Sequence, residues 1–150
     1  MDPEILRRYV APCGELCYSC VAFCDGPIAE HARELARRLK GFGRLVSTFT
    51  TFEPRVAHYD GFRDLLSYLA EGTCGSCREG DACMPDCHVR ACTRERGYDY
   101  CYQCDSFPCA DVNFDGYLLE DWLYANRRMA EIGPHAFWQE NRERGHYTPR

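Results

Sequence analysis

The stretch CGSCREGDACMPDCHVRACTRERGYDYCYQCDSFPC, residues 74–109, contains eight of the twelve cysteines of this 150-residue chain. The other four lie in CGELCYSCVAFC, residues 13–24, and no cysteine occurs in residues 25–73 or 110–150. Three CxxC pairs stand out, the usual way of presenting two thiolates to one metal ion. The pairs are Cys17/Cys20, Cys74/Cys77 and Cys101/Cys104.

The cysteines favour metal ligation over disulfides. The start, MDPEILRRYVAPCGEL, is charged and has no apolar centre of the kind that a signal peptide needs, so we expect a cytoplasmic protein. Disulfides are rare in that reducing compartment. Soft thiolate ligands suit zinc or an iron–sulfur cluster, and the groups of four and eight cysteines are multiples of a tetrahedral set.

Regular helices are predicted on both sides of the cysteine-rich segment. Asp25-Gly26-Pro27 is typical of a helix start, and an apolar stripe at helical spacing follows until Gly41. A second stripe precedes Gly72, and a third precedes Gly133. Pro134 opens a short last helix, while LVSTFTTF, residues 45–52, fits a strand or a bent helix. The predicted core positions are Ile28, Ala32, Leu35, Ala36, Leu39, Phe62, Leu65, Leu66, Leu69, Leu118, Leu119, Trp122, Leu123, Met129, Ile132, Phe137 and Trp138.

The predicted fold is therefore mainly α, with helices flanking a loop-rich, cysteine-rich segment organised by metal. Knuckle-like or ribbon-like elements would make it a small α+β protein. Length and hydrophobic content fit one domain over residues 1–150. It divides into a cysteine motif at 13–24, a helical part at 25–73, a metal-binding segment at 74–109 and helices at 110–150.

Eight thiols in residues 74–109 predict two metal sites there. Joining the two CxxC pairs would give one site, and the remaining four cysteines would form the other. Sequential quartets are the alternative. In the first arrangement the sets are Cys74/Cys77/Cys101/Cys104 and Cys83/Cys87/Cys92/Cys109; in the second they are Cys74/Cys77/Cys83/Cys87 and Cys92/Cys101/Cys104/Cys109.

The amino-terminal cysteines Cys13, Cys17, Cys20 and Cys24 have the spacing of one face of a continuous helix. Such a helix would spread them over about 16 Å, too far for one ion, and they would then be small core residues. Pro12 interrupts a helix at this point. A loop carrying Cys13, followed by a helical turn with Cys17 and Cys20, would instead close on one metal.

Other side chains in the segment are expected to support the metal rather than hold it. His88, beside Cys87, is a possible replacement ligand but is expected to be a bystander. Arginines offset the negative charge of four-thiolate sites, and aromatic rings shield the sulfurs. These residues are Arg78, Arg90, Arg94, Arg96, Tyr98, Tyr100, Tyr102 and Phe107.

Several classes of protein are disfavoured. No apolar run approaches the length of a membrane helix, and the net charge of −5 argues against general nucleic-acid affinity. The run C-x3-C-x2-C also occurs in radical S-adenosylmethionine enzymes, but the chain is too short for their barrel. No βαβ pattern supports a thioredoxin-like use of the CxxC pairs, and no catalytic triad or phosphate loop stands out.

Taken together, APCGELCYSC, CGSC, CHVRAC, GYDYCYQCDSFPC and RRMAEIGPHAFWQENRERG resemble the bacterial and archaeal domain-of-unknown-function 3795 family over about residues 11–145. Members open with Cys-Gly-x-x-Cys-x-x-Cys and end their cysteine block in Phe/Tyr-Pro-Cys. The resemblance implies no activity. It implies that the metal ligands are Cys13, Cys17, Cys20, Cys74, Cys77, Cys83, Cys87, Cys92, Cys101, Cys104 and Cys109; Cys24 lies outside the family pattern.

The functional prediction is a cytoplasmic, zinc-stabilised interaction module with two to three zinc ions per chain, a protein partner and no catalysis of its own. One alternative is a 4Fe–4S protein in electron transfer or redox sensing, because C-x3-C-x2-C-x3-C is close to the cluster run of bacterial ferredoxins. A second alternative is a metalloenzyme with an open site at Cys13, Cys17 and Cys20.

Overall fold

The structure is a computed structural model that describes residues 1–80 and 83–148. Short helical segments follow one another along the described chain. In order they are α1 (Pro3–Tyr9), η1 (Cys17–Ser19), α2 (Pro27–Arg38), η2 (Phe42–Leu45), α3 (Val46–Thr50), η3 (Pro54–His58), α4 (Tyr59–Glu71), α5 (His88–Arg96), η4 (Cys101–Gln103), α6 (Gly116–Ile132) and α7 (Pro134–Asn141).

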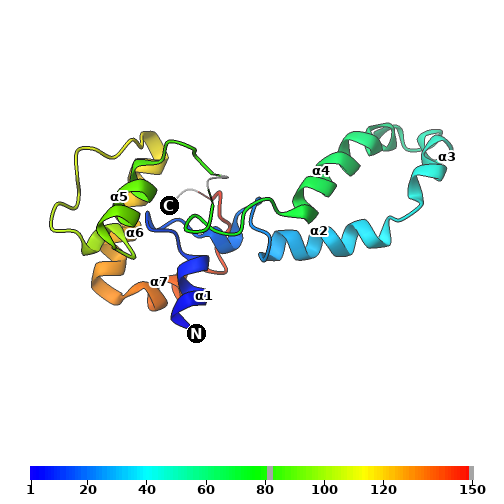
Figure 1. The fold of residues 1–150 in the computed structure, drawn as a ribbon. Helices are drawn as coiled ribbons and strands as arrows, with labels where there is room; N and C mark the ends of the chain where they lie inside the picture. Colours follow the sequence, from blue (N-terminus) through cyan, green and yellow to red (C-terminus); the bar gives the residue numbers. More distant parts are fainter. Residues whose placement is uncertain (81–82, 149–150) are drawn as a thin grey trace.

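The molecule has two parts (Figure 1). Residues 27–71, from α2 to α4, form a helical hairpin that projects from the rest of the chain; we call it the arm. The other described residues, which include all twelve cysteines, form the body. Residues 25–73 were predicted to be helical, and residues 27–71 within them form this helical hairpin.

The arm begins and turns where the sequence predicts. Gly26 caps α2 and Pro27 occupies its first turn, while Gly41, with a φ of 85°, turns the chain after α2 ends. At the tip, the ring of Phe42 packs on the rings of Phe49 and Tyr59, with centroids 5.3 and 5.0 Å apart. The open question of residues 45–52 is answered by η2 and α3, which are helical.

The arm is too thin to bury its predicted stripe. Ala32 and Leu66 are buried, as is Ala29. Leu35, Phe62 and Leu65, however, were expected in the core and are 42%, 43% and 57% exposed. Two helices have only one mutual contact line, so the flanks of each apolar stripe stay uncovered. For these three residues the predicted core position is wrong.

The arm joins the body through a narrow neck. Phe23 and Cys74 form an isolated parallel bridge, in which the Cys24 N–H donates to the Cys74 carbonyl and the Cys74 N–H donates to the Ala22 carbonyl, both at 2.9 Å. Gly72 has a φ of 60°, and a Cβ there would overlap the backbone of Cys24. Glycine is therefore required where the two ends of the arm meet.

The body is built around α6. Ala125 and Met129 of this helix are buried in one core cluster with Phe137 of α7 and Leu6 of α1, and Trp122 is buried in a second cluster with Phe114. The predicted helices before Gly133 and after Pro134 are confirmed as α6 and α7. Of the remaining predicted core residues, Leu118, Leu119, Leu123 and Ile132 are half-buried against the body.

Two helices of the body were not predicted. The first is α1, whose N-cap Asp2 accepts from the Glu4 N–H at 2.7 Å. The second is α5, which begins after Cys87 and ends at Gly97 in the left-handed conformation, inside the segment expected to be loop-rich. The sequence HVRACTRERG ends in Gly97, an ordinary helix stop, but the segment was interpreted from the spacing of its cysteines and not as a helix.

The chain is mainly helical, as predicted. In the described ranges 1–80 and 83–148 there is no β-sheet, only the bridges Val10–Leu16 and Phe23–Cys74, so the β component of the predicted fold is not confirmed. None of the described helices combines the length and the apolar character needed to cross a membrane.

Candidate metal centre

Two of the CxxC pairs adopt the same backbone. In the first knuckle, residues 16–23, the N–H groups of Ser19, Cys20 and Phe23 donate to the carbonyls three residues earlier at 3.2, 3.0 and 3.2 Å. In the second knuckle, residues 100–107, Gln103, Cys104 and Phe107 do the same at 3.1, 3.1 and 3.0 Å. The matching sequences are CYSCVAF and CYQCDSF. Each turn places its two thiols on one side of a short helical turn, as a metal knuckle requires.

A tight loop brings Cys13 to the second knuckle. The Gly14 N–H donates to the Ala11 carbonyl, and the Cys101 N–H donates to the Pro12 carbonyl at 3.0 Å. Gly14 has a φ of 93°, and a Cβ there would overlap the side chain of Ala125 on α6. The predicted loop at Cys13 followed by a turn is confirmed, and the continuous-helix alternative is excluded.

Asn126 of α6 connects three segments at once. It is fully buried, and its amide nitrogen donates to the Cys13 carbonyl at 2.7 Å and to the Trp122 carbonyl at 3.0 Å. Its amide oxygen accepts from the Tyr102 N–H at 3.0 Å. One side chain therefore fixes both the Cys13 loop and the second knuckle against α6.

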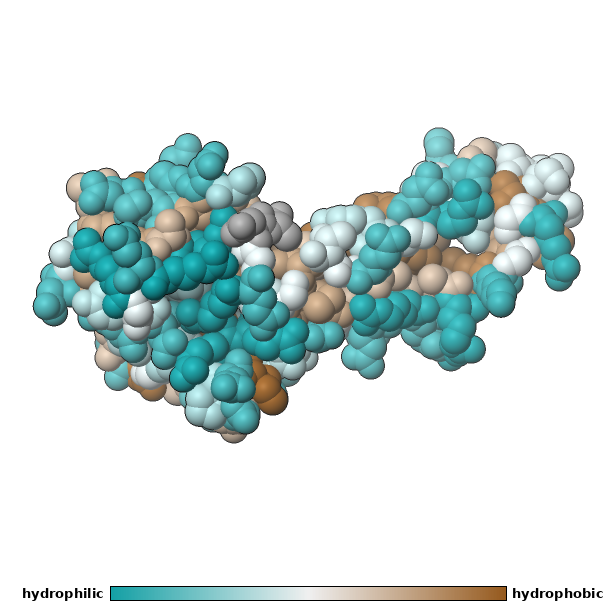
Figure 2. All heavy atoms as spheres, viewed as in Figure 1, coloured by the Kyte–Doolittle hydropathy of each residue, from teal (hydrophilic) through white to brown (hydrophobic). Residues whose placement is uncertain are grey.

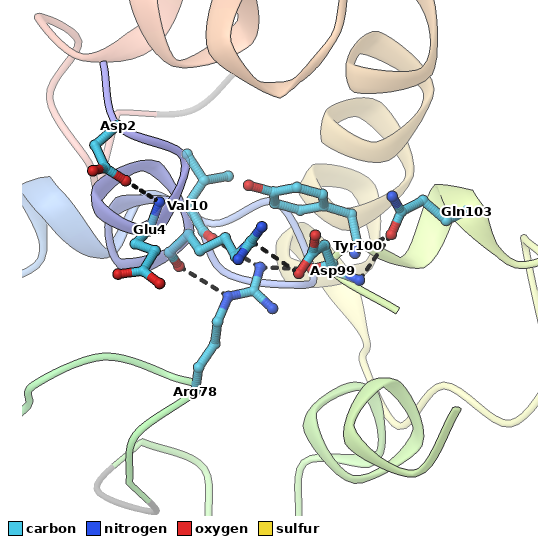
Figure 3. A network of polar contacts seen from close by, with 8 residues as sticks. Asp2, Glu4, Val10, Arg78, Asp99, Tyr100 and Gln103 are labelled. Atoms are coloured by element: carbon cyan, nitrogen blue, oxygen red, sulfur yellow. Dashed lines mark hydrogen bonds and ion pairs between the residues drawn. The ribbon is translucent and has the colours of Figure 1, made fainter. Parts of the chain in front are cut away.

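Arg78, which directly follows Cys77, ties a third cysteine-bearing segment to the other two (Figure 3). Its guanidinium donates to the carbonyls of Arg7 at 2.9 Å and Asp99 at 2.6 Å, with a longer contact to Val10 at 3.4 Å. It also lies over the ring of Tyr100, 5.1 Å from the centroid. The planar fork of arginine suits such a three-way connection.

The amino-terminal cysteines meet residues 74–87. Burial raises the pKa of Cys17 to about 12, and the thiols of Cys77, Cys74 and Cys20 add to this, while the Cys77 N–H lowers it. The Cys13 pKa is raised chiefly by full burial, with contributions from the thiols of Cys77 and Cys17. Cys77 thus lies near both, and we call this the first cluster. Its members are Cys13, Cys17, Cys20, Cys74, Cys77, Cys83 and Cys87.

Four of the other five cysteines lie around α5 and the second knuckle. Burial raises the pKa of Cys101 to about 11, and the thiols of Cys109, Cys92 and, more weakly, Cys87 contribute. Arg96 donates to the Cys104 Sγ at 3.7 Å, and its own pKa is raised by Cys92 and Cys104. We call this the second cluster, made of Cys92, Cys101, Cys104 and Cys109.

The donor set fits a soft metal, although the thiols do not converge. Within residues 1–80 and 83–148, no group of three or more His, Cys, Asp or Glu side chains is placed to hold an ion. The described cysteines are all free, and burial raises the pKa of Cys13, Cys17, Cys77 and Cys101, so these four are neutral thiols at pH 7. A bound cation would reverse this by favouring thiolate. The sulfurs would need to draw together within each cluster.

Polar donors already face several sulfurs. The indole N–H of Trp122 is buried, has no partner within ordinary hydrogen-bond limits and lowers the pKa of the Cys101 thiol. The buried guanidinium of Arg90 lowers the pKa of Cys77 and Cys83 and donates to the Cys83 carbonyl at 2.7 Å. That the arginines offset the charge of four-thiolate sites stays a prediction; Arg96 donates to the Cys104 Sγ, and Arg94 donates to the Arg78 carbonyl.

The aromatic residues of the segment take part in packing, as shielding would require. Phe107 contacts Trp122 edge-on at 5.0 Å, Tyr100 is buried and stacks with Tyr102 at 5.9 Å, and Tyr98 is half-buried. Cys24 sits in the neck, where its thiol raises the pKa of Cys74. Its place as a ligand remains a prediction.

The carboxyl-terminal segment covers the first knuckle. The Tyr147 hydroxyl accepts from the Val21 N–H at 3.0 Å and donates to the Cys20 Sγ at 3.8 Å, while His146 Nδ1 lies 3.3 Å from the Ser19 hydroxyl. Nothing in the sequence GHYTPR indicated this contact.

A cavity of about 630 Å³ opens at the start of α5 and is lined by Cys87, His88, Arg90, Asp111 and Asn113, among others. His88 is half-buried in the wall of this cavity, and the backbone N–H of His88 donates to the Asn113 Oδ1 at 3.0 Å. Cys13, Cys17 and Cys20 do not line this cavity. It therefore gives no support to an open catalytic site at those three cysteines.

Comparison with known proteins gives a family and no further relative. No curated protein and no solved structure matches the chain. Residues 9–114, which contain all twelve cysteines, the arm and both knuckles, match the family described as Protein of unknown function (DUF3795). The match covers well over half of the chain and agrees with the motifs quoted above. The protein is a member of this domain-of-unknown-function family.

Proposed function

We propose that the protein is an interaction module whose body is organised by zinc bound to its two cysteine clusters. One observation carries the proposal: four cysteine-bearing segments pack around α5 and α6. They are the Cys13 loop, the first knuckle, the segment around Cys77 and the second knuckle, and the two knuckles have the same backbone turn. The segments are connected by polar contacts from Asn126 and Arg78 and by an apolar cluster around Trp122 in which several of the cysteines themselves pack. Metal-binding energy is then folding energy for the body.

Cys92, Cys101, Cys104 and Cys109 would supply the four thiolates of one zinc site, which the influence of their thiols on one another and on Arg96 supports. This corresponds to one of the predicted sequential quartets. We favour it over the pairing of Cys74/Cys77 with Cys101/Cys104, because the thiol of Cys77 interacts with those of Cys13, Cys17, Cys83 and Cys87. The first cluster has seven thiols, enough for one or two further ions that share ligands.

A 4Fe–4S cluster is the second candidate at the first cluster. The thiol of Cys77 raises the pKa of Cys13 and Cys17, and that of Cys20 raises the pKa of Cys17 and Cys74, which offers thiols of the kind such a cluster takes. The chain would then take part in electron transfer or redox sensing. In either case the thiols need a reducing compartment, so the proposed location is the cytoplasm, with a protein as the partner.

Metal analysis and a visible spectrum after anaerobic purification test the proposal. Two to three zinc ions per chain and a colourless protein support it. A brown protein with about four irons per chain would replace zinc by a cluster at the first site. A fully reduced, folded chain without any bound metal would sink both versions.

Metal removal should separate the two parts of the molecule. After chelation, hydrogen exchange should lose protection in the body, while the arm keeps its helical protection, because the arm holds no cysteine. Cys101→Ser should act like the chelator at the second cluster. Cys24→Ser tests the one cysteine outside the family pattern, because an unchanged metal content would remove Cys24 from the predicted ligands.

A further inference from the structure

A side chain from the carboxyl end of the described chain closes over a sulfur of the first knuckle. Residues 145–148 return from α7 to this knuckle (Figure 1, red), and we call them the strap. The Tyr147 hydroxyl accepts from the Val21 N–H at 3.0 Å and donates to the Cys20 Sγ at 3.8 Å. The hydroxyl thus lies between the backbone that follows the CxxC pair and the sulfur that this pair would present to a metal.

The second knuckle has a different donor at the corresponding sulfur. Cys104 takes the place of Cys20 when the matching sequences CYQCDSF and CYSCVAF are compared. The Cys104 Sγ accepts from Arg96 at 3.7 Å, and Arg96 is the last residue of α5, the helix that also carries Cys92 of the second cluster. The two knuckles share a backbone turn. The first depends on a neutral hydroxyl of an irregular segment for this hydrogen bond, and the second on a cation of a helix.

The contacts that hold the strap to the body are polar. Its sequence, GHYT, has no aliphatic side chain, and the face of the body seen in Figure 2 is largely hydrophilic. His146 Nδ1 lies 3.3 Å from the Ser19 hydroxyl, and His146 Nε2 lies 3.9 Å from the Glu15 carboxylate. Tyr147 is 62% exposed although its hydroxyl is bonded. A segment with few buried apolar contacts opens at a small cost in free energy, so we expect the strap to open while the body stays folded.

We propose that the strap makes the first cluster an exchangeable metal site, with Tyr147 as its positioning residue, while the second cluster retains its metal. This role rests on the proposed function, in which both clusters bind zinc. A hydrogen bond to a metal-bound thiolate withdraws charge from the sulfur and makes it a poorer target for protons, so the ligand stays bound. When the strap opens, Cys20 loses this bond. The bond from zinc to the Cys20 sulfur then breaks, a thiolate or nitrogen donor of a competing ligand replaces it, and the released thiolate takes up a proton from water.

Zinc transfer from the full metal-loaded chain to an excess of the colorimetric chelator pyridylazoresorcinol tests the proposal. A fast phase from the first cluster and a slow phase from the second are expected. Tyr147→Phe keeps the ring and removes the hydroxyl, and it should speed the fast phase about tenfold while the slow phase keeps its rate. Arg96→Gln should speed the slow phase alone, which assigns the phases. Tyr117→Phe removes the hydroxyl of a 79% exposed tyrosine of α6; it is the matched control and should change neither rate.

Cobalt substitution separates a bond to the sulfur from a merely structural effect. In the Co²⁺-loaded chain, Tyr147→Phe should move the sulfur-to-metal charge-transfer band to longer wavelength, because the Cys20 sulfur regains the charge that the hydroxyl withdrew. A band at the wild-type position, or a fast phase at the wild-type rate, would overturn the inference and leave the proposed function standing. So would a single phase of zinc release from the unchanged chain. A chain that holds no zinc, measured on the same samples, would refute the proposed function and this inference with it.

Discussion

The arm and the body reach order by different means. The arm is two helices and an aromatic tip, with exposed ion pairs and no cysteine. The body connects its segments by buried polar side chains, chiefly Asn126 and Arg78, and gathers the chain's thiols between them. The arm therefore depends on periodicity, which is local in sequence. The body depends on contacts between residues as far apart as Cys13 and Asn126.

The largest effect should come from Gly14→Ala. The new Cβ would meet Ala125 on α6, and the positive φ adds strain, so the body should lose about 2–5 kcal/mol of unfolding free energy. Urea unfolding followed by circular dichroism measures it. Gly97→Ala is the matched control, because its φ is also positive but nothing lies near its Cβ; it should cost about 1–2 kcal/mol. Equal losses in both variants would refute the close approach at Gly14.

Asn126→Ala should have the second largest effect, a loss of about 2–4 kcal/mol of unfolding free energy. The Tyr102 N–H and the Cys13 carbonyl would be left without their hydrogen-bond partner. The same change should speed zinc release to a colorimetric chelator from the second cluster. Asn113→Ala, which removes bonds at the exposed end of α5, serves as the comparison and should cost less. A larger loss for Asn113→Ala would contradict the central place of Asn126.

The stability losses of Arg78→Lys and Arg55→Lys contrast the body, which contains Arg78, with the arm, which contains Arg55. An ammonium cannot reach the Arg7 and Asp99 carbonyls together, so Arg78→Lys should cost about 1–3 kcal/mol. Arg55 makes an exposed ion pair with Glu53 in the arm, and its replacement should leave the melting temperature unchanged. A cooperative loss of arm and body in Arg78→Lys would show that the neck couples them more tightly than its few hydrogen bonds indicate.

The smallest change in stability near neutral pH should come from ionisation of the cysteine thiols. In the metal-free protein, burial raises the pKa of Cys17 to about 12 and that of Cys77 to about 11, from an ordinary value of 9.0. Folding then favours the neutral thiol, so stability is fully present below pH 9 and is lost as the pH rises towards 12. Zinc-bound protein should behave in the opposite sense and weaken in acid, where protons compete for the thiolates. Thermal melts across the pH range, with and without metal, check both slopes.

Sequence periodicity sufficed for α2, α4, α6 and α7, because each has an apolar stripe between a clear start and a clear stop. It failed at Leu35 and Leu65, since a stripe shows which side is apolar and not whether anything covers it. The cysteine spacing predicted knuckles at Cys17/Cys20 and Cys101/Cys104. It did not show that Cys13 and Cys17 lie near Cys77, which depends on the Asn126 and Arg78 contacts. The likeness of CYSCVAF and CYQCDSF was readable in the sequence but was missed.

The neck has a consequence for how this chain is built. The Cys24 N–H donates to the Cys74 carbonyl at 2.9 Å and so brings together the two ends of the 49-residue segment 25–73. A segment whose ends touch can be excised, replaced or lengthened without redirecting the chain on either side. The arm is in this sense a cassette inserted between Cys24 and Cys74. Because a Cβ at Gly72 would overlap Cys24, the glycine marks the junction that a graft of any other hairpin would have to keep.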